Sequence, residues 1–348
     1  MHDPALPWLS QQTGTGQCVW LCDEHFYGFE NQLPGGAQHI YICNRYDIVQ
    51  RMQALQLQAV FSDFAEADLP GAINTLFYRV SKEKPVVHRA LNIAAAKLAA
   101  GGQLHMCGLK SEGAKNYLDK AAQLLGCAKA TRKHGLAYCA SLTRHTSVES
   151  TLDDSHYPEL RALAKAPQFA SKPGQFGWQK IDQGSEFLLQ TLAQQKLLKQ
   201  TDSLLDLGCG YGYLALEACR SLLTDLPQRL VLTDNNAAAL ISAEYNSKQL
   251  HIAAEIVPGD CGDSVSGQFQ TLLCNPPFHQ GFALSQDLTE RFLHSAARHL
   301  ENDGSAFFVV NSFIAVEQKA KPYFAQQETL ANNKQFKVIR LSRPRARA

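Results

Sequence analysis

The sequence predicts an α/β fold built twice in tandem, each half an array of buried strands with helices between them. The length of 348 residues exceeds what a single hydrophobic core usually organises, so two domains are expected. Short apolar runs of strand length alternate with helical stretches along the whole chain. The succession of apolar strand, long helix, glycine-containing turn and second strand occurs at 76–107 and again at 272–310, as in an internal duplication.

The first half contains apolar runs typical of buried strands at 19–22, 39–43, 59–62, 74–78, 103–107 and 137–141. Helices are predicted at 46–57 and at 86–100, the second ended by the glycine pair at 101–102. The second half has strand-like runs at 203–207, 229–233, 254–257, 271–274 and 306–310. We therefore expect one domain at 1–145, a linking segment at 146–180 and a second domain at 181–348.

The linking segment begins polar and ends in the run KPGQFGW at 172–178, whose proline and glycines exclude a regular helix or strand. The run DQGS at 182–185 follows, and its cap-forming side chains predict a helix that begins directly after it. An irregular stretch therefore leads into the first helix of the second domain.

The composition is that of an ordinary globular protein, with 45% apolar and 19% charged residues. The chain has no apolar run of roughly eighteen residues and no N-terminal secretion signal, so we expect a cytoplasmic protein that does not span a membrane. The ten cysteines include no CxxC pair and mostly lie in apolar runs, so reduced buried thiols and no metal site are expected. We expect the chain to act as a monomer.

The net charge of +1 conceals an uneven distribution. Residues 1–74 carry a net charge of −6, residues 75–150 carry +8, and residues 151–348 carry −1. Clusters of basic residues attract polyanions such as RNA, although solvated helix faces and a basic tail are an equally good explanation for each cluster alone. The candidate RNA-binding residues are Lys82, Lys84, Lys110, Arg132, Lys133, Arg343 and Arg345.

The most informative stretch is LLDLGCGYGY at 204–213, where a strand runs into three glycines at alternating positions and then into a helix. Glycines permit a sharp turn and bring bare backbone close to a ligand, although a plain glycine-rich turn is the alternative. Tyr213 stands where the dinucleotide fingerprint needs glycine or alanine, so NAD and FAD fit poorly. The Asp206 carboxylate would repel a pyrophosphate but suits a ligand with an ammonium group. The stretch resembles the (D/E)xGxGxG loop of the Rossmann-like class I methyltransferases, whose cofactor is S-adenosylmethionine (AdoMet).

Two further acids follow predicted strands. Asp234 ends the second strand of this half, where a carboxylate can accept hydrogen bonds from both ribose hydroxyls of a nucleoside. The run TDN at 233–235 is equally a turn that caps the next helix. Gly259 and Asp260 follow the third strand and resemble the position where the same class reads the adenine amino group, although a Gly-Asp turn is common.

The sharpest signal is NPPF at 275–278, directly after a buried strand. The two prolines remove two backbone donors and fix the shape of the loop, so that the Asn275 side-chain oxygen and the Pro276 carbonyl remain as acceptors. Two such acceptors can hold both hydrogens of a planar amino group, and Phe278 can stack on the ring that carries it. A rigid loop with a core phenylalanine is the alternative. The first half has YRVS at 78–81 instead, and no GxGxG, so its chemistry has been lost.

NPPF resembles the (N/D/S)PP(Y/F/W) signature of methyltransferases that act on amino nitrogens of adenine, cytosine, guanine or glutamine. Together with the degenerate first half, the segments at 173–185 and 275–281, and NNKQFKV at 332–338, it resembles one bacterial family. This is the ribosomal RNA guanine-N2 methyltransferases of the RsmC and RlmG type, with the "methyltransferase small" domain. KEKP at 82–85 and LKSEG at 109–113 favour the small-subunit, RsmC-like branch. The family usually has a Ser-Arg-type pair where this chain has Gly177 and Trp178.

The resemblance implies AdoMet as cofactor, guanosine N2 of 16S rRNA as target, and the rRNA or the 30S subunit as partner. It also implies catalysis by Asn275, Pro276, Pro277 and Phe278. The implied cofactor-binding residues are Gly184, Ser185, Asp206, Gly208, Cys209, Gly210, Gly212, Asp234, Asn235, Gly259, Asp260 and Asn275. The first domain would be a cofactor-less RNA-docking module. The rival hypotheses are a 23S rRNA guanine-N2 methyltransferase, a glutamine-N5 methyltransferase of a release factor, and a non-catalytic RNA-binding assembly factor.

Overall fold

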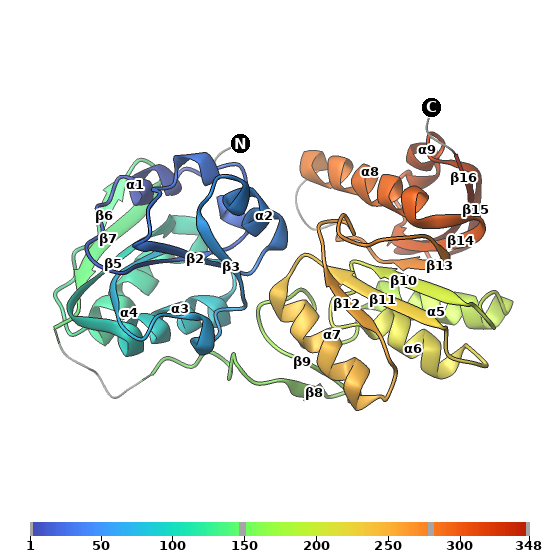
Figure 1. Cartoon of the computed structure of the whole chain (residues 1–348), viewed down its shortest axis with the longest axis horizontal. Helices are drawn as coiled ribbons and strands as arrows, with labels where there is room; N and C mark the ends of the chain where they lie inside the picture. Colours follow the sequence, from blue (N-terminus) through green and yellow to red (C-terminus); the bar gives the residue numbers. More distant parts are fainter. Residues whose placement is uncertain (1–2, 146–150, 278–281, 346–348) are drawn as a thin grey trace. The chain divides into compact units, whose positions relative to one another are not determined.

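The computed structural model describes residues 3–145, 151–277 and 282–345. It divides into two compact units, Met1–Glu159 and Leu160–Ala348 (Figure 1). The segment expected as a linker at 146–180 is thereby divided, because residues 160–180 belong to the second unit. There, β8 (Arg161–Leu163) and β9 (Ala166–Ser171) form a hairpin, and the Asn246 side chain bonds both the N–H and the C=O of Ala170, at 2.7 and 2.8 Å.

The first unit contains a seven-stranded sheet with strand order β3-β2-β1-β4-β5-β7-β6. Its first five strands are parallel, and β7 and β6 are antiparallel to their neighbours. The strands are β1 (Cys18–Cys22), β2 (His39–Cys43), β3 (Gln58–Phe61), β4 (Ile73–Arg79), β5 (Leu98–Leu109), β6 (Arg132–His134) and β7 (Ala137–Thr143). One face is covered by α1 (Leu6–Ser10) and α2 (Tyr46–Ala54), and the other by α3 (Lys84–Lys97) and α4 (Ala114–Leu124). Single 3-10 turns lie at η1 (Glu24–Phe26), η2 (Glu30–Gln32), η3 (Glu66–Asp68) and η4 (Lys110–Glu112).

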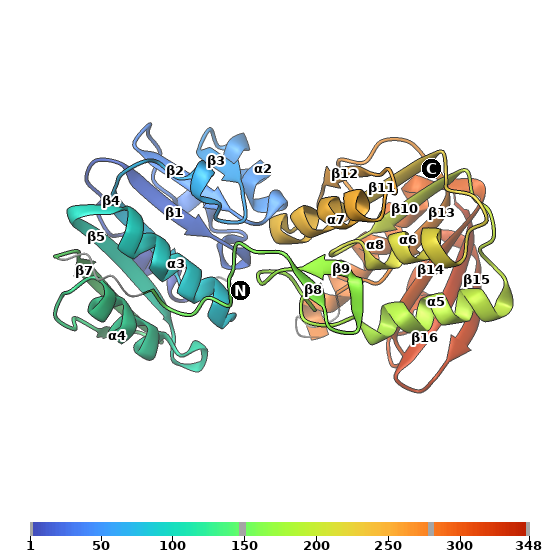
Figure 2. The same ribbon diagram turned by 90° about the horizontal axis from the view of Figure 1, so that it is seen from below.

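The second unit contains a seven-stranded sheet with strand order β12-β11-β10-β13-β14-β16-β15. The strands are β10 (Ser203–Leu207), β11 (Arg229–Asp234), β12 (Glu255–Pro258), β13 (Phe269–Cys274), β14 (Leu300–Asn311), β15 (Phe324–Asn332) and β16 (Phe336–Pro344). The helices α5 (Gln183–Gln195), α6 (Tyr213–Ser221) and α7 (Ala237–Gln249) lie on one face, and α8 (Phe282–His299) and α9 (Val316–Ala320) on the other (Figures 1 and 2).

The two units share one topology, because replacing β1–β7 by β10–β16 converts one strand order into the other. They also share an irregularity, since the strand register slips between Ile73 and Thr75 in β4 and between Phe269 and Thr271 in β13. At each slip a glycine is needed, because a β-carbon on Gly102 or on Gly304 would lie 2.9 or 2.8 Å from a backbone oxygen. The two expected Rossmann-like domains are therefore confirmed, and the common irregularity supports an internal duplication.

Two expectations about the elements are wrong. The helix expected at 86–100 ends at Lys97, because Gly101 and Gly102 lie inside β5, where the left-handed φ of Gly101 bends the strand. The antiparallel strands β15 and β16 were not expected at all. Strand β15 lies at the edge of its sheet and is largely exposed, so it lacks the apolar run that marked the buried strands.

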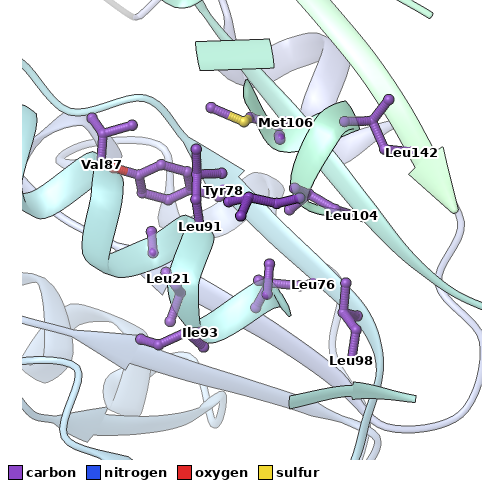
Figure 3. Packing of buried hydrophobic residues seen from close by; sticks show 14 of the residues in the cluster. Leu21, Leu76, Tyr78, Val87, Leu91, Ile93, Leu98, Leu104, Met106 and Leu142 are labelled. Carbon is purple, nitrogen blue, oxygen red and sulfur yellow. The ribbon is translucent and has the colours of Figure 1, made fainter. Parts of the chain in front are cut away.

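Packing of α3 on the sheet of the first unit is shown in Figure 3. Val87 and Leu91, one helical turn apart, lie over Leu76, Tyr78 and the neighbouring strands, and all of these side chains are at least 99% buried. Full burial of each such side chain stabilises the fold by about 1.5–3 kcal/mol. The sheet of the second unit, from which the glycine loop and the Asn275 loop project, has a separate core that includes Leu205, Leu272 and Leu293. In the described part of the chain, no helix has the length and apolar character that crossing a membrane requires.

Candidate active site

The glycine loop at 208–212 connects β10 to α6, and its three glycines have φ values of 81°, 54° and 83°. All three lie in the left-handed region, which other residues adopt only with strain. A β-carbon on Gly208 would lie 3.2 Å from the Phe292 ring, and one on Gly212 would lie 3.0 Å from Leu216. On Gly210 it would have no described atom within 4 Å. The middle glycine is therefore where a ligand can approach the bare backbone.

The loop holds its own shape through its N–H groups. The N–H groups of Gly208 and Cys209 both donate to the Thr233 carbonyl, at 2.9 and 3.0 Å. The Gly210 N–H donates to Asp234 Oδ2 at 2.9 Å. These donors are consequently occupied within the protein, so the loop contributes close backbone approach to a ligand in place of free N–H groups.

Asp206, at the end of β10, is 1% exposed, and its Oδ2 accepts a hydrogen bond of 3.1 Å from the Ala215 N–H in the first turn of α6. Burial raises the pKa of this carboxyl to about 7; the Ala215 bond opposes the rise and the nearby Asp234 charge adds to it. The carboxyl thus joins the strand to the helix beneath the loop. Its expected pairing with an ammonium group of the ligand remains a prediction, and such a cation would lower its pKa.

Asp234 lies beside this loop as expected. Its Oδ2 accepts from the Gly210 N–H and its Oδ1 accepts from the Asn236 N–H, both at 2.9 Å. Binding of ribose hydroxyls by this carboxylate remains a prediction. The cap of α7 is Asn236, whose Oδ1 accepts from the Ala239 N–H at 3.1 Å. The Asp234 side chain is therefore not the helix cap that was considered as its alternative role. Asn235 lies next to it, partly buried, and its expected cofactor contact remains a prediction.

The turn with Gly259 and Asp260 lies beside Asp234, because the Gly259 N–H donates to the Asp234 carbonyl at 3.0 Å. The Asp260 carboxylate forms an ion pair with Arg291 of α8. The structure thus brings the expected adenine-reading residue to the cofactor side of the loop and gives it a cationic partner. Reading of an adenine amino group by Asp260 stays a prediction.

Asn275 follows β13 and is held by the start of α5. Its Nδ2 donates to Asp182 Oδ1 at 2.6 Å and to Ser185 Oγ at 3.0 Å, so both amide hydrogens are used. The assignment of the amide nitrogen follows from chemistry, because the amide oxygen facing a carboxylate would be repelled. Asn275 Oδ1 is thereby left as an acceptor, next to the carbonyl of the buried Pro276. The use of Asn275 Oδ1 and the Pro276 carbonyl as a joint pair of acceptors remains a prediction.

Asp182 was expected to do no more than help begin a helix. It does cap α5, where its Oδ1 accepts from the Ser185 N–H at 3.0 Å, and the same oxygen also holds Asn275. A β-carbon on Gly184 would lie 3.0 Å from Asp182 Oδ1 and 3.5 Å from Asn275 Nδ2. Gly184 and Ser185, expected at the cofactor, therefore lie against the Asn275 amide. The separation of 93 residues between Asp182 and Asn275 leaves no local sequence signal for this contact.

The remaining site residues are distributed as follows. Pro277 is exposed, and Phe278 lies outside the described residues. Arg343 and Arg345 follow the part of β16 that pairs with Ser305, near the amino end of β14, whereas Asn275 lies at the carboxyl ends of the parallel strands. The structure thus does not bring these two arginines to Asn275. In the first unit the exposed candidates lie at carboxyl strand ends or on the edge strand β6; they are Lys82, Lys84, Lys110, Arg132 and Lys133.

The first unit has lost the same constellation. Arg79 lies four residues after Thr75, as Asn275 lies four residues after the equivalent Thr271, so Arg79 and not Tyr78 stands in the place of Asn275. The fully buried Arg79 guanidinium pairs with Asp3 at 2.6 Å and with Glu112 at 2.5 Å. A cavity of about 540 Å³ beside these ion pairs is lined by Asp3, His25, Arg79, Lys82, Leu109, Ser111 and Glu112. At this position the first unit therefore has a guanidinium held in ion pairs, whereas the second unit has the Asn275 amide, whose oxygen is an acceptor.

Comparison with known proteins agrees with this geometry. Residues 166–340, slightly more than half of the chain, match the family model described as "Methyltransferase small domain". The chain is 29% identical over 311 residues to a ribosomal RNA small subunit methyltransferase C of Erwinia tasmaniensis, covering 88% of this chain and 86% of the relative. A protein of the same name from Shewanella oneidensis is 29% identical over 269 residues, covering 76% of each chain.

A solved structure has the same architecture over almost the whole chain. It is a T. thermophilus 16S rRNA N2 methyltransferase (RsmC) in complex with AdoMet and guanosine, with a TM-score of 0.81 and 22% identity, covering 98% of this chain and 92% of that one. The likeness extends through both units and supports the fold of each. With the glycine loop, the strand-end acids and the Asn275 amide in place, and with the family model matching over this part of the chain, the protein belongs to the methyltransferase small domain family.

Proposed function

We propose that this protein is an AdoMet-dependent methyltransferase that transfers a methyl group to the exocyclic N2 of a guanosine in 16S ribosomal RNA, free or within the 30S subunit. The observation that carries the proposal is the orientation of the Asn275 amide. Its two hydrogens are held by Asp182 and Ser185, so only its oxygen is available to a substrate. Two acceptors with no donor beside them favour a substrate group that donates two hydrogen bonds, such as an amino group. They disfavour a carbonyl group, which can only accept.

The contribution of the protein's own residues to the reaction is to orient the amino group of the base. The two amino hydrogens of the base donate to Asn275 Oδ1 and to the Pro276 carbonyl, which turns the nitrogen lone pair away from the conjugated ring. When bound, AdoMet supplies an electrophilic methyl group on a sulfonium sulfur. Transfer would form the new N–C bond as the C–S bond breaks, the sulfur would leave as a neutral thioether, and the amine would then release one proton to solvent. Because the nucleophile attacks as a neutral amine, the transfer step needs no general base.

The described residues fit AdoMet. The space at Gly210 admits the methionine part, and the Asp234 carboxylate, a hydrogen-bond acceptor beside the loop, suits the ribose hydroxyls. Asp206 lies beneath the loop with a pKa near 7, poised to become fully ionised when a cationic group approaches. Asp260 follows Gly259, whose N–H donates to the Asp234 carbonyl, and this proximity supports a role for Asp260 at the base end of the nucleoside. These contacts are parts of the proposal.

The choice of ribosomal RNA rests on the relatives and on charge. The curated relatives are named as small-subunit rRNA methyltransferases, and the RsmC structure holds guanosine. The exposed basic residues of the first unit would supply the attraction for phosphates. Lys110 directly follows β5, and Arg132 and Lys133 lie in β6 opposite the β7 residues that pair with Cys107 and Gly108. They therefore gather at one end of the sheet.

We further infer that the enzyme acts without a metal, as a monomer, in the cytoplasm where ribosomes are assembled. Among the described residues, one group of potential metal ligands is close enough to share an ion: Asp23, Glu24 and His25. Burial alone would lower the pKa of His25, but pairing with Asp23 and Glu112 outweighs it and raises that pKa to about 10. The His25 ring lies 2.8 Å from Asp23 and 3.7 Å from Glu112, and we propose that this group functions as a charge cluster.

The test is transfer of tritium from labelled AdoMet, with isolated 16S rRNA, isolated 23S rRNA, 30S subunits and a release factor as separate acceptors. We expect label in 16S rRNA or 30S subunits, recovered as N2-methylguanosine after nucleoside analysis, and none with Asn275→Ala. Label in 23S rRNA or in a glutamine side chain would replace the proposed substrate. Binding of rRNA with no label in any acceptor would indicate a non-catalytic assembly factor.

A further inference from the structure

Phe313 is a large apolar side chain that is 70% exposed, and it lies near the active site. It belongs to the short loop between β14 and α9, which leaves the sheet at the carboxyl end of β14. Strand β13, which Asn275 follows, pairs in parallel with β14, so both loops leave the sheet at the same end. An aromatic ring displayed at this end is a stacking surface that the methyl-transfer chemistry does not use.

The loop that carries Phe313 is held rigidly against the β15–β16 turn. The Ser312 N–H donates to the Gln335 carbonyl at 2.9 Å, and the Ser312 hydroxyl donates to the Lys334 carbonyl. Asn332 Oδ1 accepts from the Lys334 N–H at 2.9 Å, and Asn333 Oδ1 accepts from the N–H groups of Gln335 and Phe336 at 3.0 and 2.7 Å. Lys334 is exposed and has a φ of 73°, a left-handed conformation that costs energy in a lysine. Hydrogen bonds from Ser312 thus join the loop that carries the exposed Phe313 to the turn that carries the exposed Lys334.

This turn is connected to the Asn275 amide. The Gln335 side chain donates to Gln183 Oε1 at 3.3 Å, directly before Gly184. A β-carbon on Gly184 would lie 3.4 Å from the Phe336 ring and 3.5 Å from Asn275 Nδ2. The NNKQFKV run at 332–338, for which the chemistry of transfer has no use, therefore lies at the margin of the amine-binding site.

We propose that Phe313 and Lys334 form a subsite for the nucleotide that adjoins the target guanosine in the RNA. The base of that nucleotide stacks on the Phe313 ring, and its phosphate pairs with the Lys334 ammonium group. Stacking needs no particular base, so this subsite binds a splayed single strand and does not read its sequence. The inference rests on the proposed function, because it assumes that the substrate is RNA.

The experiment uses the full chain and a single-stranded oligoribonucleotide of about nine residues with one central guanosine. Phe313→Ala is expected to weaken binding roughly 5- to 100-fold, and Phe313→Trp to restore it with quenching of the new indole fluorescence. Lys334→Ala is expected to reduce the salt dependence by about one phosphate contact, or about 0.7 in log–log slope. The affinity for AdoMet is expected to be unchanged in all three variants.

Two matched controls come from the opposite end of the same sheet. Leu226, 52% exposed, lies shortly before β11, and the exposed Lys199 lies shortly before β10. Leu226→Ala and Lys199→Ala are expected to bind the oligonucleotide like the wild type. Equal affinities for Phe313→Ala and Leu226→Ala, with methyl transfer to rRNA intact in the wild type, would overturn the subsite alone. Absence of methyl transfer to rRNA by the wild type would overturn the proposed function, and the subsite with it.

Discussion

Arg79 and Asn275 occupy the same position in two copies of one fold, and their polar groups are held in opposite ways. The Arg79 guanidinium is closed off by the carboxylates of Asp3 and Glu112. The Asn275 amide is held through its hydrogens, which leaves its oxygen available. Likewise, α2 begins three residues after Cys43 and α7 begins three residues after Asp234, so a thiol stands in place of the acid that we propose binds the ribose. At the carboxyl ends of the strands, the sheet of the first unit therefore carries ion pairs, and the sheet of the second unit carries hydrogen-bond acceptors.

The first prediction concerns the number of cofactor sites. Calorimetric titration of the full chain with AdoMet should give one molecule per chain, because only the second unit combines the glycine loop with an acid at the Asp234 position. Asp234→Ala should abolish this binding, because it removes the ribose acceptor and the partner of the Gly210 N–H together. Cys43→Ala, at the equivalent place in the first unit, is the matched control and should leave the titration unchanged. Two molecules bound per chain would contradict the loss of a site in the first unit.

The sequence predicts the parts of this arrangement that depend on local pattern. Strand β10 with its glycines, the acid that ends β11 and the prolines after Asn275 could all be located, because each is a short run with its own signal. Contacts between residues distant in sequence could not be predicted, because no local pattern encodes them. Three examples are the hydrogen bond from Asn275 to Asp182, the ion pair of Asp260 with Arg291, and the hydrogen bond from Ser312 to Lys334. The bonds from the N–H groups of Gly208 and Cys209 to Thr233 are of the same kind, because Thr233 belongs to another strand.

The second prediction concerns the amide clamp. Asn275→Ala should lower kcat roughly 10²- to 10³-fold, as loss of a positioned polar group in a transition state does, while the affinity for AdoMet changes far less. Asp182→Asn keeps an Oδ1 that can accept from both Ser185 and Asn275, so it should retain most of the activity.

Asp182→Ser is the informative comparison, because serine still caps a helix but is too short to hold Asn275 as well. Its melting temperature should stay close to that of the wild type, while kcat falls and the KM for RNA changes little. Steady-state kinetics and thermal unfolding of the three variants check this. A serine variant with wild-type kcat would show that the clamp does not orient the amide.

The third prediction concerns the pH dependence of stability in the first unit. The pKa of His25 is raised from 6.5 to about 10, so its contribution is complete below pH 6.5 and is lost as the pH rises toward 10. Burial alone would raise the pKa of Glu112, but its bonds to His25, Arg79 and Leu109 outweigh this and lower it from 4.5 to about 2. Its contribution is complete above pH 4.5 and is lost as the pH falls toward 2. The cluster therefore stabilises the fold most between pH 4.5 and 6.5.

The measurement is the free energy of unfolding of the wild type and of His25→Ala across this range. The difference between the two proteins should be largest near pH 5 to 6 and should shrink as the solution is made alkaline. Arg79→Leu leaves the carboxylates of Asp3 and Glu112 buried without their cation, and it should cost about 3–5 kcal/mol at neutral pH. A constant difference between wild type and His25→Ala from pH 5 to pH 9 would mean that the imidazole is not charged in the folded protein.

The last prediction concerns how the protein attracts RNA. Neither unit has a large net charge, since residues 1–159 carry −1 and residues 160–348 carry +2, so the phosphate attraction has to come from a local cluster of basic residues. Residues 75–150 of the first unit carry +8 and are the strongest such cluster. Each phosphate neutralised by a basic side chain adds about 0.7–0.9 to the log–log slope of affinity against salt concentration. Reversal of four residues to glutamate should weaken rRNA binding and flatten this slope, with AdoMet affinity unchanged; they are Lys82, Lys110, Arg132 and Lys133.

Reversal of Arg343 and Arg345 is the comparison within the same chain. These arginines lie at the sheet end away from Asn275, so RNA that reaches the amide clamp has no need to contact them, and their reversal should change the slope less. Binding of 16S rRNA between 50 and 200 mM salt distinguishes the two variants, because exposed charges that only solvate the surface leave the slope unaltered. A slope unchanged by the four reversals would leave the first unit without a docking role, and a larger effect from Arg343 and Arg345 would place the RNA on the opposite end of the sheet.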